Sequence, residues 1–190
     1  MHTESVKSRP VSRAENKLAG AARAFSYDFR GRTVLDIGSS TGGFTEYALR
    51  SGASRVVAVE KGTRQMKAPL RFDERIDLHE KTDIFEFKTD TEFDVVLADV
   101  SFVSLKKVLA YAKKYIKTED FLVMLKPQFE ARPEQLVKGV VKNERMRREI
   151  IYEFEFWLKE NGFLVLKKRD NEVAGKNGNV ERFYWLKVAR

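Results

Sequence analysis

LDIGSSTGGFT, from Leu35 to Thr45, joins a short β-rich run to a segment of helical periodicity. Its three glycines allow a tight turn and let a ligand approach the backbone, and its small polar residues leave room beside a helix N-terminus. The glycines are Gly38, Gly42 and Gly43, and the small polar residues are Ser39, Ser40 and Thr41. A strand, a glycine-rich turn and a helix in this order predict the ligand-binding unit of a doubly wound α/β fold.

The rest of the chain repeats this alternation of strand and helix. Short apolar runs predict strands at residues 33–37, 55–60, 76–80, 93–100, 121–126, 163–167 and 181–188. Longer periodic segments predict helices at residues 42–51, 63–71, 105–116 and 143–160. Strands that are apolar almost throughout predict a parallel sheet covered on both faces. We therefore expect a doubly wound, mostly parallel, seven-stranded sheet. Its last two strands form an antiparallel pair, because their connection is too short for a crossover helix.

The composition is that of one folded domain with a basic surface. The chain has 190 residues, 43% of them hydrophobic, and its formal net charge of +8 favours a polyanionic partner. Residues 1–12 are predicted to form a basic flexible arm ahead of a domain at 13–190. No apolar run approaches the roughly 20 residues that span a bilayer, so a cytoplasmic protein without membrane contact is expected. The chain has no cysteine and only two histidines, which excludes disulfides and thiolate sites and leaves little for histidine metal sites.

Three acids at predicted strand ends indicate which ligand the glycine-rich turn holds. The turn matches neither of the common phosphate-binding spacings, and Asp36 puts a carboxylate where a phosphate would be repelled. Such an acid suits a cationic ligand, such as the amino group of S-adenosylmethionine. Glu60 is placed to bind a ribose diol, and Asp83 is placed to bind an adenine amino group. Each acid alone is better explained as a loop cap or a solvated charge, but the three in order favour an adenosyl ligand.

Two more charged residues close apolar strands. Asp99 follows an apolar run in the string ADVSF, and a half-buried carboxylate there needs partners. Lys126 ends the string FLVMLK and is followed by Pro127, which stops the strand. A desolvated lysine at the mouth of a sheet can serve as a base, although a lysine that extends its charge into water explains the position as well.

Six strings carry a resemblance to a known family. They are SRAENKL from Ser12, LDIGSSTGGFTEYALRSGA from Leu35, ADVSFVSL from Ala98, LKPQFE from Leu125, KGVV from Lys138 and GNVE from Gly178. In this order they resemble the TlyA family, also called hemolysin A, which is related to the FtsJ-like ribose 2′-O-methyltransferases. The resemblance runs from about Val11 to the C-terminus, and the combination is more specific than any single string.

The resemblance implies a class I methyltransferase that transfers a methyl group from S-adenosylmethionine to a ribose 2′-hydroxyl of ribosomal RNA, with a cytidine as the expected target. It places a Lys-Asp-Lys-Glu tetrad at Lys17, Asp99, Lys126 and Glu181. It places cofactor contacts at Asp36, Gly38, Ser39, Ser40, Thr41, Gly42, Gly43, Phe44 and Asp99, and more loosely at Glu60 and Asp83. It implies no metal.

The tetrad suits an in-line transfer, in which a hydroxyl oxygen must be aligned with the methyl group. A ribose hydroxyl is a poor nucleophile, so we expect Lys126 to accept or polarise its proton. Glu181 would hold Lys17 and the ribose in register. Asp99 would orient Lys126 while facing the sulfonium.

Ribosomal RNA or a ribosomal subunit is the partner that the resemblance implies. TlyA proteins generally carry an S4-type RNA-binding domain before the methyltransferase domain, and about a dozen residues precede SRAENKL here. We expect a separate RNA-binding partner, recognition through the chain's own basic surface, or a narrower substrate range. Phe102 and Phe129 are candidates for stacking on a flipped base, and core packing would explain them equally well. The predicted basic surface comprises Lys106, Lys107, Lys113, Lys114, Arg132, Lys138, Lys142, Arg145, Arg147, Arg148, Lys167, Lys168 and Arg169.

Other functions remain open from the sequence. An RNA-binding or ribosome-assembly factor could keep this fold with little turnover, but binding alone gives no reason for two lysines and two acids at these positions. A membrane-lytic protein has little support, because there is no spanning segment and no long amphipathic lytic helix. A small-molecule or protein substrate is a less favoured variant of the same chemistry.

Overall fold

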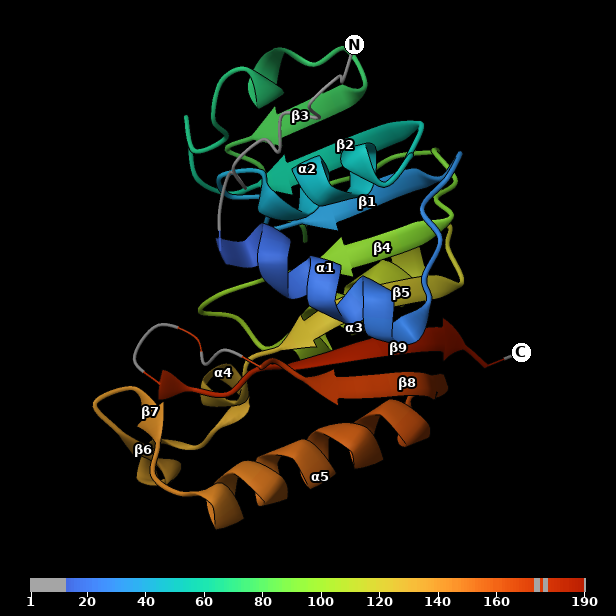
Figure 1. The fold of residues 1–190 in the computed structure, drawn as a ribbon. Coiled ribbons are helices and arrows are strands. Elements are labelled where there is room, and N and C mark those ends of the chain that lie inside the picture. The colour runs from blue at the N-terminus through green and yellow to red at the C-terminus, as the bar shows by residue number, and fades with distance from the viewer. Residues whose placement is uncertain (1–12, 173–174, 176–177, 190) are drawn as a thin grey trace, which may run out of the picture.

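The central sheet has seven strands within the residues that the computed structural model describes, which are 13–172, 175 and 178–189. Their order is β3-β2-β1-β4-β5-β9-β8 (Figure 1). The strands are β1 (Thr33–Ile37), β2 (Arg55–Glu60), β3 (Ile76–Glu80), β4 (Val95–Ala98), β5 (Asp120–Leu125), β8 (Phe163–Asp170) and β9 (Arg182–Val188). β1 to β5 pair in parallel, whereas β9 is antiparallel to both β5 and β8. The predicted doubly wound sheet with an antiparallel final pair is confirmed.

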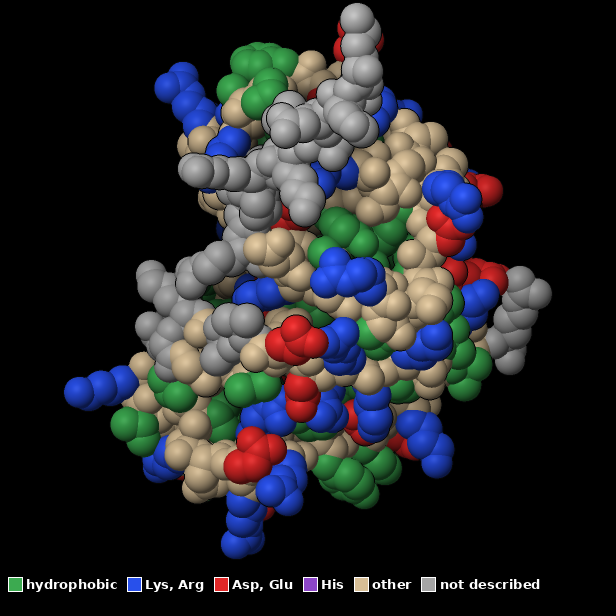
Figure 2. Space-filling model, in the orientation of Figure 1, with side chains coloured by type: hydrophobic (Ala, Val, Ile, Leu, Met, Phe, Trp, Pro, Cys, Tyr) green, Lys and Arg blue, Asp and Glu red, His purple; other side chains and the backbone are tan. Residues whose placement is uncertain are grey.

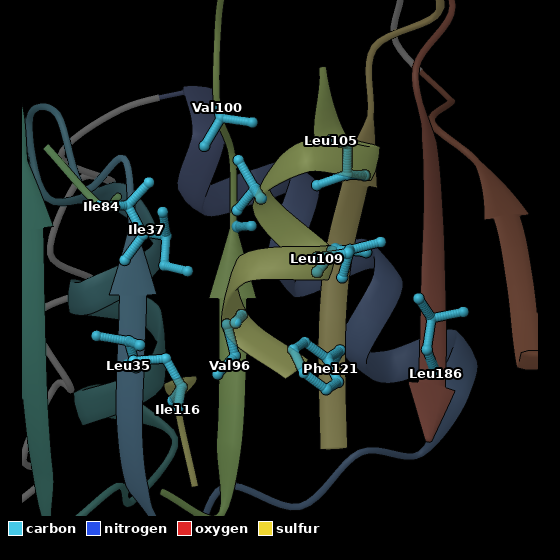
Figure 3. Close-up of a cluster of buried hydrophobic side chains, with 14 of the residues drawn as sticks. Leu35, Ile37, Ile84, Val96, Val100, Leu105, Leu109, Ile116, Phe121 and Leu186 are labelled. Atoms are coloured by element: carbon cyan, nitrogen blue, oxygen red, sulfur yellow. The ribbon is translucent and has the colours of Figure 1, made fainter. Parts of the chain in front are cut away.

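Helices cover both faces of this sheet. They are α1 (Arg13–Phe25), α2 (Gly43–Arg50), α3 (Leu105–Tyr115), α4 (Pro127–Glu130) and α5 (Glu144–Glu160). α1 and α2 cross the near face in Figure 1, where Leu18 and Phe44 join one buried cluster. On the opposite face, Leu105 and Leu109 of α3 pack against Phe121 of β5 (Figure 3). Burial on both faces explains why β1, β2, β4 and β5 are apolar almost throughout, whereas the half-buried edge strand β3 carries charged residues.

The remaining elements lie between β2 and β3 and between α4 and α5. They are two 3-10 turns, η1 (Leu70–Phe72) and η2 (Pro133–Gln135), and a small hairpin of β6 (Leu136–Val137) and β7 (Val140–Val141). In the described part of the chain, no helix is both long enough and apolar enough to span a bilayer.

The helix predicted at residues 63–71 is wrong, because the structure has only the turn η1 there. Pro69 has no amide hydrogen to give to a helix and disfavours helical backbone in the residue before it. Arg64 has a positive φ of 51°, and the Gln65 amide donates to Glu80 Oε1 at 3.0 Å. The backbone of this segment is therefore held in part by the end of β3 instead of by helical hydrogen bonds.

Helix α1 is absent from the sequence prediction. Its buried face carries small residues such as Ala21 and Ala22 beside Leu18 and Phe25, and small residues give a weak periodic signal. The predicted arm, residues 1–12, lies outside the described residues.

Candidate active site

A cavity of about 600 Å³ opens at the carboxyl ends of the parallel strands. Its walls come from α1, the glycine-rich turn after β1, the ends of β4 and β5, and the segment between β8 and β9. This is the crevice in which doubly wound folds bind ligands, and its volume is that of a site for a small organic molecule.

The glycine-rich turn lies close to the end of β4. Gly38 has a φ of 78°, and a Cβ atom added to it would lie 3.1 Å from the carbonyl oxygen of Asp99. Only glycine fits this approach without strain. Of the predicted cofactor contacts, those that line the cavity are Gly38, Ser39, Ser40, Thr41, Gly43, Phe44 and Asp99.

Asp36 lies beneath the cavity and does not line it. Its side chain is fully buried, and its Oδ2 accepts a hydrogen bond from Thr45 Oγ1 at 2.6 Å. Among the described residues its Oδ1 has no hydrogen-bond partner. Burial raises the pKa of Asp36 from 3.8 to about 7, and the nearby acids Asp99 and Glu60 add to the effect. Asp36 thus supports the first turn of α2 through Thr45.

Glu60 and Asp83 already have protein partners. Glu60 accepts from the amide of Ser40 at 2.9 Å and from the amide of Gly62 at 2.6 Å. Asp83 is paired with Lys61 at 2.9 Å, and the hydrogen bond from Lys61 holds the pKa of Asp83 below its usual range. Neither acid lines the cavity, so their predicted contacts with a ribose and an adenine stay predictions.

The four residues of the predicted tetrad all line the cavity and form two ion pairs. Lys17 of α1 pairs with Glu181, whose side chain is 5% exposed. Lys126 Nζ lies 2.6 Å from Asp99 Oδ1. Tertiary structure therefore brings together charges that are far apart in the sequence, and it leaves both lysines partly exposed to the cavity.

Two polar residues that the sequence analysis did not identify support these pairs. Lys126 Nζ donates to Ser101 Oγ at 2.8 Å, and Asn171 Nδ2 donates to Glu181 Oε2 at 3.0 Å. Ser101 is itself part of the string ADVSF that contains Asp99, so its position in that loop was the available signal. No comparable signal marks Asn171.

Glu130 connects the loops that present Asp99 and Lys126. Its Oε2 accepts from Ser104 Oγ at 2.7 Å, and its Oε1 accepts from the amide of Leu105 at 2.6 Å. These bonds cap the N-terminus of α3 from the end of α4. Burial raises the pKa of Glu130, with these hydrogen bonds opposing the effect. The last residue of the string LKPQFE therefore has a structural role that the sequence analysis did not assign.

Phe102 is an exposed aromatic side chain three residues after Asp99. It is 92% exposed and has a positive φ of 62°. Its ring centroid is 5.1 Å from that of Phe129. A bulky residue in this backbone region is uncommon, and strain of this kind concentrates at functional sites.

Part of the predicted basic surface is internal. Arg147 is buried and pairs with Asp170 at 2.6 Å, and Lys167 donates to the carbonyl of Phe25 at 2.6 Å. Lys168 pairs with Glu155 at 2.8 Å. The assignment of Arg147 to the basic surface is wrong, because its side chain is buried. Lys167 and Lys168 are exposed as predicted, but each is held by a partner within the chain. Figure 2 shows Lys and Arg side chains, with Asp and Glu side chains among them, over the lower half of the face that it presents.

The strand order, the antiparallel β9 and the cavity at the strand ends define a Rossmann-like methyltransferase domain. A solved S-adenosylmethionine-dependent methyltransferase from Mesorhizobium loti shares the fold, with a TM-score of 0.62 over 88% of this chain and 96% of that chain, at 14% identity. The chain belongs to the FtsJ-like methyltransferase family, whose profile matches residues 10–188.

The TlyA resemblance is confirmed by two curated relatives. The 23S rRNA (cytidine-2′-O)-methyltransferase TlyA of Campylobacter jejuni is 35% identical over 92% of this chain and 70% of its own length. The 16S/23S rRNA (cytidine-2′-O)-methyltransferase TlyA of Mycobacterium tuberculosis is 37% identical over 94% of this chain and 68% of its own. A solved Streptococcus thermophilus protein that carries a hemolysin name has a TM-score of 0.90 at 31% identity, over 98% of this chain and 70% of that one.

Proposed function

We propose that this chain transfers a methyl group from S-adenosylmethionine to a ribose 2′-hydroxyl of ribosomal RNA, with a cytidine as the target. One observation carries the proposal: two lysine–carboxylate pairs, Lys17 with Glu181 and Lys126 with Asp99, face the same cavity as the glycine-rich turn. A cofactor site and a set of proton-handling groups in one cavity suit group transfer to a hydroxyl.

The cavity residues fit this cofactor. The close approach of Gly38 to Asp99 and the small side chains after it leave space for a ligand against the backbone. The wall of the cofactor half would consist of Gly38, Ser39, Ser40, Thr41, Gly43 and Phe44. When bound, S-adenosylmethionine supplies an electrophilic methyl group on a cationic sulfonium, and the Asp99 carboxylate at the edge of this wall complements that charge.

Lys126 is the residue that we assign to the ribose hydroxyl. Its Nζ is held by Asp99 and by Ser101 Oγ, so this nitrogen has a defined position at the mouth of the sheet. From there Nζ, as the neutral amine with a free lone pair, accepts the hydroxyl proton as the oxygen attacks. The Lys17–Glu181 pair in the same cavity positions the ribose, with Asn171 holding the Glu181 carboxylate.

The test is a map of 2′-O-methyl groups on ribosomal RNA transcripts after incubation with this protein and S-adenosylmethionine. We expect a single class of new marks on cytidine ribose. An unchanged map in the presence of bound cofactor would reject the proposal and favour an RNA-binding or assembly factor with the same fold.

Phe102 is expected to stack on the target base. Replacing it by alanine or leucine removes the aromatic ring, and we expect kcat/KM for RNA to fall by about 5- to 150-fold, which corresponds to the roughly 1–3 kcal/mol of base stacking. Because the side chain is 92% exposed, the melting temperature and the cofactor affinity should stay at wild-type values. Methylation kinetics of the two variants check this, and wild-type kinetics for Phe102→Leu would show that the ring does not stack.

A further inference from the structure

The β6–β7 hairpin and the string KGVV at its tip have no role in the mechanism above. Its strands pair through Leu136 with Val141 and Val137 with Val140, so Lys138 and Gly139 form the two-residue turn. Their φ angles are 49° and 78°, which places both residues in the left-handed region. Turns of this kind favour asparagine, aspartate or glycine at the first position. A lysine there is strained, and such strain points to a functional reason for the side chain.

The turn presents an unpaired positive charge to solvent. Lys138 and Gly139 are both exposed, and so is Lys142 just after the hairpin. Among the described residues, neither lysine has an acidic partner. By contrast, Arg132 lies 3.2 Å from Glu134, and Arg145 lies 3.1 Å from Glu149. In the part of the chain that the structure describes, Lys138 of the hairpin and Lys142 just after it are therefore available to bind an external anion.

The inner side of the hairpin is bonded to the segment that presents Glu181. Asn179 is buried, and its Oδ1 accepts from the amide of Val141 at 3.1 Å. Its Nδ2 donates to the carbonyl of Gly139 at 3.1 Å. Val180 is held in turn by Arg147 Nε at 3.1 Å. The Asn179 amide thus ties the turn of the hairpin to a backbone that reaches Glu181 two residues later.

The hairpin also borders the loop that presents Lys126. Pro127, the residue after Lys126, lines a cleft of about 140 Å³ together with Val140 and Asn179. Figure 1 shows the hairpin beside α4, at the end of the sheet where the parallel strands terminate. A ligand on the hairpin would therefore contact an element that adjoins both halves of the tetrad.

We propose that the β6–β7 hairpin is an RNA-docking element of the active site. Lys138 contacts a backbone phosphate of the strand that carries the target nucleotide, and Asn179 couples the position of the docked hairpin to Glu181. An RNA backbone fits because phosphate contacts set the register of a nucleic acid on a protein, and within the described ranges neither Lys138 nor Lys142 has an acidic partner. The inference rests on the proposed function and names where its substrate is held.

Lys138→Asn tests the docking contact, because asparagine suits the turn while it removes the charge. We expect an unchanged or higher melting temperature. Affinity for an in vitro transcript of the large ribosomal RNA should fall by about 3- to 10-fold, and the plot of log affinity against log salt should become shallower by about 0.7 to 0.9. Lys138→Arg should restore wild-type affinity. Lys159→Ala, which removes an exposed cation at the other end of α5, should match the wild type.

Asn179→Ala tests the link to Glu181. We expect kcat for methyl transfer to fall by about 10-fold or more, because small displacements of reacting groups are costly, while RNA and cofactor affinities are retained. Wild-type RNA affinity in Lys138→Asn, or wild-type kcat in Asn179→Ala, overturns the inference. RNA affinity is measured without methyl transfer, so it tests the docking element separately from the proposed function. If the protein binds the transcript but does not methylate it, that result contradicts only the proposed function. A wild-type protein that does not bind the transcript contradicts the docking element.

Discussion

Lys126→Ala is expected to lower kcat for methyl transfer by about 10²- to 10⁴-fold, which is the usual contribution of a positioned base. The variant loses the nitrogen that lies 2.6 Å from Asp99 Oδ1 and 2.8 Å from Ser101 Oγ. The glycine-rich wall of the cavity does not depend on this side chain, so cofactor binding should be nearly intact. The measurement is transfer of labelled methyl from S-adenosylmethionine to the transcript, alongside a cofactor titration.

Lys126→Arg is the matched control for this prediction. A guanidinium keeps the positive charge that Asp99 needs, but it cannot give up its proton to act as a base. We therefore expect Lys126→Arg to fold like the wild type and to transfer methyl groups as poorly as the alanine variant. Turnover near the wild-type rate in either variant would remove Lys126 from the role of base.

Asp36→Asn is expected to stabilise the cofactor-free protein more at high pH than at low pH. Burial raises the pKa of Asp36 to about 7 in the folded state, so the folded protein binds this proton more tightly than the unfolded chain. Stability contributed by this group is therefore lost as the pH rises from about 4 to about 7. Asparagine keeps an oxygen for the Thr45 hydroxyl and never ionises. Its advantage over aspartate should grow by about 2 kcal/mol between roughly pH 5.5 and 8.5.

Denaturant unfolding of both proteins at the two pH values measures this difference. Asp83→Asn is a suitable control, because the pKa of Asp83 lies below its usual range and its effect should be constant over the same interval. A pH-independent effect of Asp36→Asn would contradict the placement of an ionisable carboxyl under the cavity. The same variant also tests the predicted cofactor contact of Asp36, since removal of that charge should weaken binding of a cationic ligand.

Sequence reasoning worked best where a segment is buried on both sides. The predicted strands at 33–37 and 55–60 coincide with β1 and β2, which are buried along most of their length. The strand predicted at 76–80 coincides with β3, a half-buried strand at the edge of the sheet. A strand inside a parallel sheet must be apolar along its length, so its residue composition alone is enough to predict it. The prediction failed for α1, because its small buried residues give a weak periodic signal. It also failed for residues 63–71, because Pro69 disfavours a helix and the amide of Gln65 is bonded to Glu80 at the end of β3.

The candidate site, like the fold, could be predicted from the sequence only in part. The glycine-rich turn is readable in the sequence, because the close approach of its backbone to the end of β4 restricts the residue type at Gly38. The strings around Lys17, Asp99, Lys126 and Glu181 were also recognisable as a family pattern. The sequence analysis expected Glu181 to hold Lys17 and Asp99 to orient Lys126, and the structure has these two ion pairs. The hydrogen bonds of Ser101 and Asn171 to these pairs were not expected, since each joins separate segments of the chain.

The sequence by itself determined the doubly wound sheet, the family and the set of residues to look for, because apolar periodicity and short motifs are local properties. Only the tertiary structure decided that Asp36 lies beneath the cavity and that Glu130 and Asn179 connect the loops of the site. Hydrogen bonds such as those of Asn179 to Val141 and Gly139 join groups about 40 residues apart. Their geometry exists only after the sheet has brought the ends of its strands together.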